Sequence, residues 1–349
     1  MDTQKMENTR NTALPIAVII LNWNGKKLLE EFLPSVVENS SRDISRLIVA
    51  DNGSTDDSVE YIRQNYGDTV ETLCFSQNYG FAEGYNKAIA AVDNEYVVLL
   101  NSDVAVTPDW DTELLAFMEM HPDYAACQPK VLSYRNPSQF EYAGAAGGYI
   151  DKNGYPYCRG RLFGICETDS GQYDEPADIF WATGACLMIR RDLYLAAGGL
   201  DAAFFAHMEE IDLCWRLQIP GHRIAAVPAA CVYHLGGGSL PADNPKKTYL
   251  NFRNNLLMLH KNLPDKVRTG FLFRRRLLDT LAFVKFLLTL DFPNARALLK
   301  AHRDFARMRK QYTTHPEANL IGQVPGSRIN LLSAFYLCRQ TKFSELRNI

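Results

Sequence analysis

The sequence predicts an α/β fold built on a mostly parallel sheet, with helices on its faces and a helical extension after it. Three apolar runs in the first third are four to six residues long and rich in Val, Ile and Leu, namely Ile16–Leu21, Leu47–Ala50 and Val97–Leu100. Strands that are buried on both faces of a parallel sheet have this composition. Amphipathic stretches separate the runs, and such alternation is typical of a doubly wound sheet.

The segments between these runs are expected to form helices over Lys26–Val37, Asp56–Gln64 and Phe81–Val92. Ser and Thr side chains precede the second segment and offer capping oxygens, and acidic residues occupy its first turn. The middle of the chain, from about 125 to 240, is richer in Gly, Tyr and Pro, and Lys152-Asn153-Gly154 favours a hairpin. From about Asn244 onward the pattern is helical and basic.

Charge divides the chain into two parts, although the net charge of the 349 residues is only −3. Residues 1–244 carry 17 Lys and Arg against 34 Asp and Glu, whereas residues 245–349 carry 20 against 6. The hydrophobic fraction of 47% excludes a disordered or fibrous protein. We therefore expect a flexible start over residues 1–14, a catalytic α/β domain over 15–244 and a basic helical region over 245–349.

Targeting signals and metal-binding cysteine patterns are missing from the sequence. The eight cysteines form no CxxC pair, and the first apolar stretch ends at Asn22 without a small-residue cleavage site. The longest apolar candidate for a membrane span, Leu277–Leu290, contains Asp279 and Lys285 and is shorter than the ~20 residues that a span needs. These features favour a reduced, cytoplasmic protein.

Polar residues follow each of the three predicted strands. The clusters are Asn22–Gly25, Asp51–Ser54 and Asn101–Asp103, and the carboxyl ends of parallel strands meet at one edge of a sheet. Turns also favour Asn, Asp, Gly and Ser, so a single cluster would indicate only a turn. The segment after the first strand has one glycine instead of GxGxxG, and no Walker motif occurs, which argues against nicotinamide and P-loop chemistry.

Eight segments together closely resemble family 2 of the inverting nucleotide-sugar glycosyltransferases, and the early ones are most similar to its rhamnosyltransferase-type branch. In family order and spacing, over roughly residues 15–260, they are Ile19–Gly25, Val49–Asp56, Asn78–Asn86, Leu99–Val104, Thr183–Ala185, Gly198–Asp201, Glu209–Arg216 and Tyr233-His234. The resemblance implies a GT-A fold, with a Rossmann-like sheet, and an activated sugar donor.

The resemblance places the donor nucleotide at the first strand ends. Asp51 would accept a hydrogen bond from the imide N–H of uracil or thymine, and an ionised acceptor makes this bond stronger. Asn22 and Trp23 would wall the base. The segment that closes over the nucleotide would use Asn78, Gly80, Gly84 and Asn86.

The resemblance also implies a divalent metal ion, Mn²⁺ or Mg²⁺, on the donor diphosphate. Asn101-Ser102-Asp103 stands where the family has its DxD-type motif, with Asn in place of the first Asp. Asp103 would hold the metal, and His234 resembles the late histidine that completes its ligands. Oxygen ligands suit these cations, and a nitrogen ligand shifts the preference toward Mn²⁺.

The general base of the family falls in the acidic segment that begins at Glu209. Aligned on Asp212–Arg216, the base position is Glu210, where the family usually has Asp. Glu209 and Asp212 could share that role on the acceptor side, and acidic residues in a first helical turn also favour the helix dipole. By resemblance, Trp181, Gly184 and Ala185 form the wall on the acceptor side.

The basic region after Asn244 permits two interpretations. Arg274–Arg276 precede an apolar segment, and a second basic run spans Arg303–Lys310, which suits a helix lying on an anionic membrane surface. A helical bundle packed on the catalytic domain with a solvated basic face is the other interpretation. No recognition module for nucleic acid accompanies the charge.

The sequence thus predicts a metal-dependent, inverting transferase that moves a sugar from a UDP- or dTDP-linked donor, with dTDP-rhamnose as a candidate, to a glycan or glycolipid hydroxyl. The family context suggests cell-surface polysaccharide synthesis on the cytoplasmic face of a membrane. The alternatives are a sugar-phosphate nucleotidyltransferase, which would need a Gly-rich phosphate loop, and a catalytically silent sugar-nucleotide-binding protein.

Overall fold

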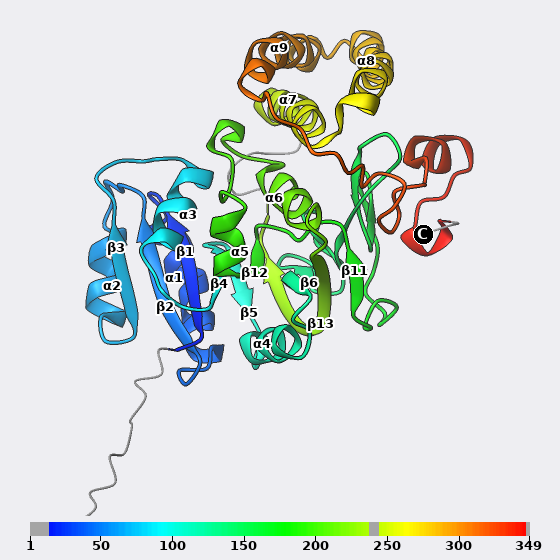
Figure 1. Cartoon of the computed structure of the whole chain (residues 1–349). Coiled ribbons are helices and arrows are strands. Elements are labelled where there is room, and N and C mark those ends of the chain that lie inside the picture. Colours follow the sequence, from blue (N-terminus) through cyan, green and yellow to red (C-terminus); the bar gives the residue numbers. More distant parts are fainter. Residues whose placement is uncertain (1–13, 237–243, 347–349) are drawn as a thin grey trace, which may run out of the picture.

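A computed structural model of the chain describes residues 14–236 and 244–346. The expectation of a flexible start therefore lies outside the described residues, except at Leu14. A mixed, mostly parallel sheet flanked by helices forms the body, and a bundle of the three helices α7 (Pro245–Asn262), α8 (Asp265–Leu288) and α9 (Phe292–Met308) lies beyond one end of it (Figure 1).

The main sheet has nine strands, and eight of them run in the order β11-β13-β6-β12-β4-β1-β2-β3, while β5 pairs with β13. The pairs β1–β2, β1–β4, β2–β3 and β13–β6 are parallel, whereas β12 runs antiparallel to both of its neighbours. The strands span β1 (Ile16–Asn22), β2 (Ser45–Asp51), β3 (Val70–Cys74), β4 (Tyr96–Asn101), β5 (Val104–Val106), β6 (Tyr124–Ser133), β11 (Ala177–Ile179), β12 (Cys186–Arg190) and β13 (Arg223–His234).

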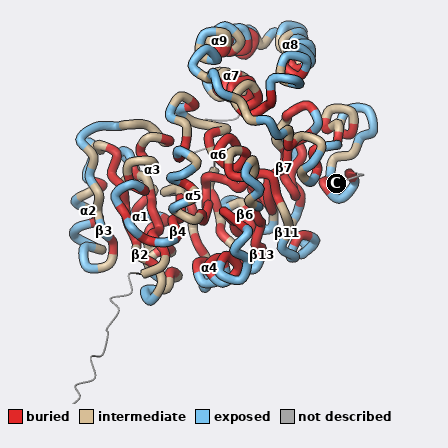
Figure 2. The backbone as a smooth tube through the Cα atoms, viewed as in Figure 1, coloured by how far each residue is buried: buried red, intermediate tan, exposed pale blue. Residues whose placement is uncertain are grey.

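Apolar side chains alternate between two cores on the two faces of this sheet. Ile16, Val18 and Ile20 of β1 pack with α1 (Lys26–Asn39), α2 (Ser58–Tyr66) and α4 (Trp110–Met120), whereas Ala17 and Ile19 pack with α3 (Phe81–Ala90) and α6 (Glu209–Gln218). The short helix α5 (Arg191–Ala196) contributes Tyr194 to the second core. Figure 2 shows the sheet strands as the most buried part of the body.

The three predicted strands are confirmed, and so are the helices between them to within three residues at each end. Sequence reasoning missed β3, because Glu71 and Thr72 separate Val70 from Leu73 in this edge strand and leave no continuous apolar run. The hairpin predicted at Lys152–Gly154 joins β7 (Gly148–Ile150) to β8 (Pro156–Cys158). Two short strands, β9 (Arg161–Leu162) and β10 (Ile165–Cys166), complete a second, antiparallel sheet.

The C-terminal region is helical through Met308 and largely irregular from Tyr312 to Leu346. That tail returns to the second sheet, where Tyr157 Oη donates to the Gly326 carbonyl (3.1 Å) and the Lys152 N–H donates to the Ile329 carbonyl (2.9 Å). Its Phe343 ring lies 5.1 Å from that of Tyr149.

All eight cysteines have free thiols, and no helix in the described ranges is long and apolar enough to span a bilayer.

Candidate active site

The polar ends of β1, β2 and β4 meet at one edge of the sheet, as their sequence predicts. In the parallel register Asn22 lies beside Asp51, and Leu21 lies beside Asn101. The Asn22 amide donates to Asp51 Oδ1 (3.0 Å), and the Ser54 N–H donates to Asp51 Oδ2 (3.0 Å). These contacts fix the Asp51 carboxylate in a nearly buried position, at 3% exposure. Trp23 beside it is 56% exposed, so its indole face is available to a flat ligand.

A second loop lies against the end of β2 through Asn52, a residue that sequence reasoning did not single out. Its side-chain amide donates to Asn78 Oδ1 and to the Gly80 carbonyl, both at 3.0 Å, and its carbonyl oxygen accepts the Tyr79 N–H. Gly53 has φ = +74°, and a Cβ there would lie 2.6 Å from the Gln77 backbone. The two loops can approach this closely only because the position is glycine.

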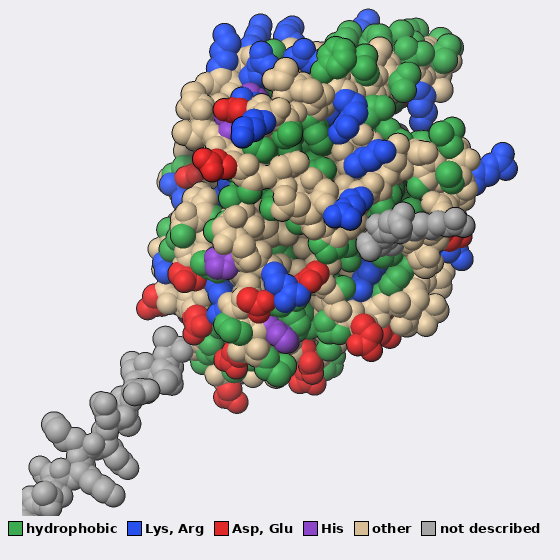
Figure 3. All heavy atoms as spheres, turned by 45° about the vertical axis from the view of Figure 1, so that its right-hand side comes forward, with side chains coloured by type: hydrophobic (Ala, Val, Ile, Leu, Met, Phe, Trp, Pro, Cys, Tyr) green, Lys and Arg blue, Asp and Glu red, His purple; other side chains and the backbone are tan. Residues whose placement is uncertain are grey.

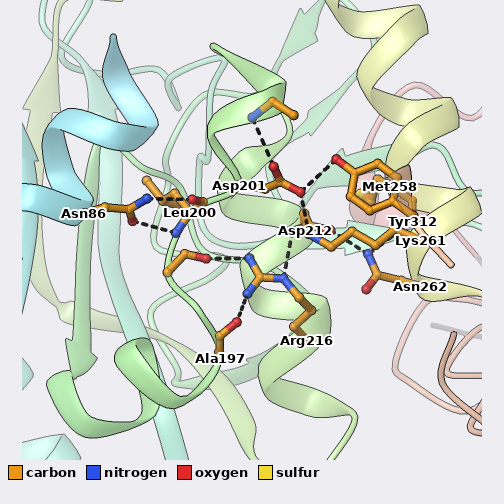
Figure 4. A network of polar contacts seen from close by, with 12 residues as sticks. Asn86, Ala197, Leu200, Asp201, Asp212, Arg216, Met258, Lys261, Asn262 and Tyr312 are labelled. Atoms are coloured by element: carbon orange, nitrogen blue, oxygen red, sulfur yellow. Dashed lines mark hydrogen bonds and ion pairs between the residues drawn. The ribbon is translucent and has the colours of Figure 1, made fainter. Parts of the chain in front are cut away.

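Two of the residues expected to close over the nucleotide, Gly84 and Asn86, also make packing contacts within the fold. A Cβ on Gly84 would lie 2.9 Å from the Leu21 side chain, so this glycine lets α3 pack against β1. Asn86 Oδ1 accepts a hydrogen bond from the Leu200 N–H (2.9 Å), which holds the loop after α5 (Figure 4). The same oxygen accepts from Tyr194 Oη (2.6 Å). Both positions therefore have a packing role in the fold, whereas Trp23 is exposed.

The structure brings together the two predicted metal ligands, which are far apart in the sequence. Strand β5 pairs with the end of β13, so that His234 lies opposite Val104 and the Leu235 N–H donates to the Asp103 carbonyl. His234 Nε2 lies 3.2 Å from Asp103 Oδ1, and Nδ1 lies 3.3 Å from Glu141 Oε2. Sequence reasoning missed Glu141, which lies in a loop without periodicity.

The charge of this cluster is set by the two carboxylates around the imidazole. Burial by itself would lower the pKa of His234, but Asp103 and Glu141 outweigh it and raise the pKa to about 10. Within residues 14–236 and 244–346 no three His, Cys, Asp or Glu side chains surround one point as a closed metal site. Asp103 and Nε2 of His234 face each other, however, and this pair fits a cation that displaces the Nε2 proton and takes its other ligands from phosphate oxygens and water.

The predicted base lies at the start of α6, after a backbone segment of unusual conformation. Phe205, His207 and Met208 have φ values of +68°, +68° and +74°, which non-glycine residues rarely adopt. The Asn254 amide on α7 donates to the carbonyls of Phe204 (3.0 Å), Ala206 (2.8 Å) and His207 (2.7 Å). A residue of the C-terminal region therefore holds the loop that positions the start of α6.

The first turn of α6 contains two carboxyl groups in an apolar environment. Burial raises the pKa of Glu210 to about 7, and burial together with the Glu210 charge raises the pKa of Glu209 well above its ordinary value. Each has one buried carboxyl oxygen without a hydrogen-bond partner. The Glu210 side chain leaves α6 toward Gly184, where the Phe81 ring also packs. A carboxyl group that titrates near neutral pH suits a general base.

Asp212, the other candidate for that role, is committed to the packing of α6 against α7. Its carboxylate accepts hydrogen bonds from Arg216 Nε (2.8 Å), Lys261 Nζ (2.9 Å) and Asn262 Nδ2 (2.7 Å), and it is fully buried (Figure 4). Lys261 also binds Asp201, which accepts from Tyr312 Oη. The structure thus separates Asp212 from Glu210 by environment, although only two positions separate them in the sequence.

The remaining predicted acceptor-side residues form a packed layer behind the site. Trp181 is buried, and its Nε1 donates to the Tyr149 carbonyl (2.9 Å), so it supports the second sheet. The Ala185 carbonyl accepts the Asn101 N–H (3.0 Å), which joins the turn at Gly184 to the Asn101-Ser102-Asp103 segment. The Gly184 turn thus lies between Glu210, whose Cβ is 4.0 Å from where a Cβ at Gly184 would be, and the segment that carries Asp103.

The profile described as Glycosyl transferase family 2 matches residues 17–195, more than half of the chain. The chain belongs to this family. As a family 2 glycosyltransferase it is 27% identical over 248 residues to the N-acetylglucosaminyl-diphospho-decaprenol L-rhamnosyltransferase of Mycobacterium tuberculosis, a match that covers 63% of this chain and 75% of the relative. It is 24% identical over 220 residues to the rhamnosyltransferase WbbL of Escherichia coli, covering 59% and 79%.

Solved structures show the same fold at low sequence identity. GalNAc-T7 with UDP, GalNAc and Mn²⁺ superposes with a TM-score of 0.56 at 16% identity, over 73% of this glycosyltransferase and 49% of that chain. The mannosyltransferase PcManGT of Pyrobaculum calidifontis, in complex with GDP-Man and Mn²⁺, gives 0.52 at 15% identity, over 85% and 84%. These likenesses confirm the α/β fold predicted from the sequence.

Proposed function

We propose that this glycosyltransferase moves a sugar, with inversion, from a UDP- or dTDP-linked donor to a hydroxyl group of a glycan or glycolipid. The observation that carries the proposal is a set of three chemically distinct groups: the fixed carboxylate of Asp51, the Asp103–His234 pair and the partly buried Glu210, whose pKa is raised to about 7. The rhamnosyltransferase names of the relatives make dTDP-rhamnose the first donor to test.

The nucleotide would bind at the ends of β1 and β2. Asp51 keeps free lone pairs beside its bonds to Asn22 and Ser54 and can accept the imide N–H of a pyrimidine, which an adenine base does not present. The exposed ring of Trp23 would cover one side of the base. Asn78 and Gly80 would shape the other side, since Asn52 holds their loop against β2.

Asp103 and His234 would hold Mn²⁺ or Mg²⁺ together with oxygens of the donor diphosphate, and the bound cation would offset negative charge on the leaving group. The pairing of an oxygen and a nitrogen ligand favours Mn²⁺. Glu141 on the opposite ring nitrogen would orient the imidazole of His234. Asn101 and Ser102 would line the diphosphate from the same segment as Asp103.

Glu210 would remove the proton from the acceptor hydroxyl while that oxygen attacks the anomeric carbon. The bond from this carbon to the diphosphate breaks as the new one forms, and its electron pair leaves with the nucleoside diphosphate. Attack opposite to the leaving group inverts the anomeric configuration. Gly184 lies beside Glu210, and burial together with the Glu210 charge would keep Glu209 in its protonated form, so Glu209 would not serve as the base.

The acceptor would be a glycan or a lipid-linked sugar in polysaccharide synthesis, which would require the enzyme to work at the cytoplasmic face of a membrane as a peripheral protein. The test is a panel of nucleotide sugars scored for released UDP or dTDP across a titration of Mn²⁺ and Mg²⁺, with and without acceptor. Metal-dependent release from one pyrimidine-linked sugar supports the proposal. Binding without turnover of any donor would identify a catalytically silent protein and overturn it.

A further inference from the structure

Helix α8 carries an apolar face that nothing in the described structure covers. Only four of its 24 residues are buried, and they are Phe271, Leu272, Arg275 and Asp279. Five large apolar side chains are instead 44–80% exposed, at Phe273, Leu277, Leu281, Val284 and Leu288. Their spacing of three or four residues places them on one side of the helix. An uninterrupted exposed stripe of this kind marks an interaction surface.

Basic side chains flank this stripe on the neighbouring helix. Arg296, Lys300 and Arg303 of α9 are exposed and line one shallow hollow together with Leu299. Figure 3 shows Lys and Arg side chains along the top of the bundle beside a hydrophobic patch, whereas acidic side chains gather at the opposite end of the molecule. The charge division in the sequence is therefore a division between two ends of the protein.

The structure also corrects the expectation that Arg274–Arg276 as a group faces a membrane. Arg275 is buried, its guanidinium lies 3.7 Å from the centre of the Tyr155 ring, and it donates to the Asn153 carbonyl (3.2 Å) and pairs with Asp279 (3.3 Å). Arg274 donates to the Lys152 carbonyl (2.8 Å). These two residues fasten α8 to the body, as the interpretation of a bundle packed on the catalytic domain expects at this point of the chain.

We propose that the apolar stripe of α8 and the basic side chains of α9 together bind the surface of a bilayer containing anionic lipids. Apolar side chains in the interface and Lys or Arg among the headgroups are the two contributions that hold an interfacial helix. A second copy of this chain fits the surface less well, because a symmetric contact would bring two sets of Arg296, Lys300 and Arg303 together. The acidic body, repelled by the lipid, would face away from it.

This orientation has a consequence that depends on the proposed function. The bundle lies beyond the carboxyl ends of β1, β2 and β4, on the side of the sheet that holds the candidate site (Figure 1). Helix α7 contacts the α6 start through Asn254 and Lys261. Binding through α8 and α9 would therefore hold the site near the membrane, where a lipid-linked acceptor presents its sugar.

The proposal is tested by co-sedimentation of the full chain with phosphatidylcholine vesicles. The vesicles are prepared with and without phosphatidylglycerol, and binding is measured at low and at high salt. We expect binding to the anionic vesicles that weakens as salt rises. Arg296→Glu/Arg303→Glu should weaken it at least about tenfold at low salt. Leu281→Gln/Leu288→Gln should weaken it at both salt concentrations. Matched controls on the body, Arg42→Glu/Arg63→Glu and Met120→Gln/Leu195→Gln, change exposed residues of the same kinds and should bind as the native protein does.

Three results would overturn the proposal: no vesicle binding by the native protein, equal loss in the controls, or a native dimer that only Leu281→Gln/Leu288→Gln dissociates, without vesicle binding. Circular dichroism confirms that each variant is folded. The assay contains neither donor nor acceptor, so its outcome is independent of the proposed transferase reaction. Failure of donor turnover with intact vesicle binding would reject the proposed function alone.

Discussion

Replacing Glu210 by glutamine should lower the activity of the enzyme and raise its stability at the same time. The substitution keeps the size and hydrogen-bonding capacity of the side chain but removes its ability to take a proton. Loss of a general base typically costs a factor of ~10²–10⁴ in rate. Donor affinity should change little, because the donor contacts proposed above come from other residues.

The stability effect follows from the pKa of the buried carboxyl group. Burial raises the pKa from its ordinary 4.5 to about 7, so the folded protein holds this proton more tightly than the unfolded chain does. The stabilisation is fully present below pH ~4.5 and is lost as the pH rises through about 7. A shift of this size corresponds to at most ~3 kcal/mol at ~1.4 kcal/mol per unit. Glu210→Gln avoids that loss, so its advantage over the native protein should grow as the pH rises from ~4.5 and level off above about 7.

Urea denaturation at pH 5 and pH 8, together with donor and acceptor kinetics over the same range, measures both effects. The native rate of transfer should rise about tenfold per unit below pH 7 and level off above it, because only the ionised carboxylate accepts the proton. Glu209→Gln is the matched control: it removes the neighbouring carboxylate from the same turn and should also gain stability at pH 8, with transfer retained. Full transfer by Glu210→Gln, or its loss only in Glu209→Gln, would refute the assignment of the base.

Three further substitutions probe other parts of the site and its support. Asp103→Ala should abolish metal-dependent donor turnover in a Mn²⁺ titration while circular dichroism stays native; activity that persists in chelator-treated buffer would contradict the metal assignment. Asn254→Ala removes the donor to three loop carbonyls, so the free energy of unfolding measured in urea should fall by about 1–3 kcal/mol. The kcat should fall by a larger factor than the donor KM rises. An unchanged kcat would show that the loop keeps its conformation without Asn254. Arg275→Met leaves the Asp279 carboxylate buried without its arginine and should lower the free energy of unfolding by ~3–5 kcal/mol. The control Arg276→Met changes an exposed residue and should alter it by no more than ~0.5 kcal/mol. Equal effects would show that Arg275 does not fasten α8.

The sequence predicts the part of the fold that depends on local patterns of apolar and polar residues. The strands at Ile16, Leu47 and Val97 are continuous apolar runs because both of their faces are buried, and their polar ends mark the site edge. Strand β3 escapes prediction because an edge strand needs only one apolar face. The return of the 312–346 tail to the second sheet depends on single long-range contacts, such as that of Tyr157 with Gly326. No local sequence pattern predicts such contacts.

The predicted and the missed residues of the candidate site differ in the same way: the former lie in local sequence motifs, and the latter are brought there by long-range contacts. Asp51, Asp103 and Glu210 stand in motifs, so a reader of the sequence finds them directly. Glu141, Asn52 and Asn254 act by holding those residues or the loops that carry them, and the fold alone brings them there. Asp212 shows the converse: its place in an acidic motif suggests chemistry, whereas three hydrogen-bond donors around it show that it joins two helices.

The loop before α6 explains why the region after residue 244 belongs to the working enzyme. Three non-glycine residues at positive φ cost on the order of 1–3 kcal/mol each, so the segment 205–208 needs support from outside itself. Asn254 supplies that support at the loop carbonyls, and Lys261 compensates the buried charge of Asp212 one turn into the helix. Both residues lie on α7, beyond the boundary at which the family motifs end. Helix α7 thus joins the bundle to the loop that precedes Glu210, through Asn254, and to the first turns of α6, through Lys261.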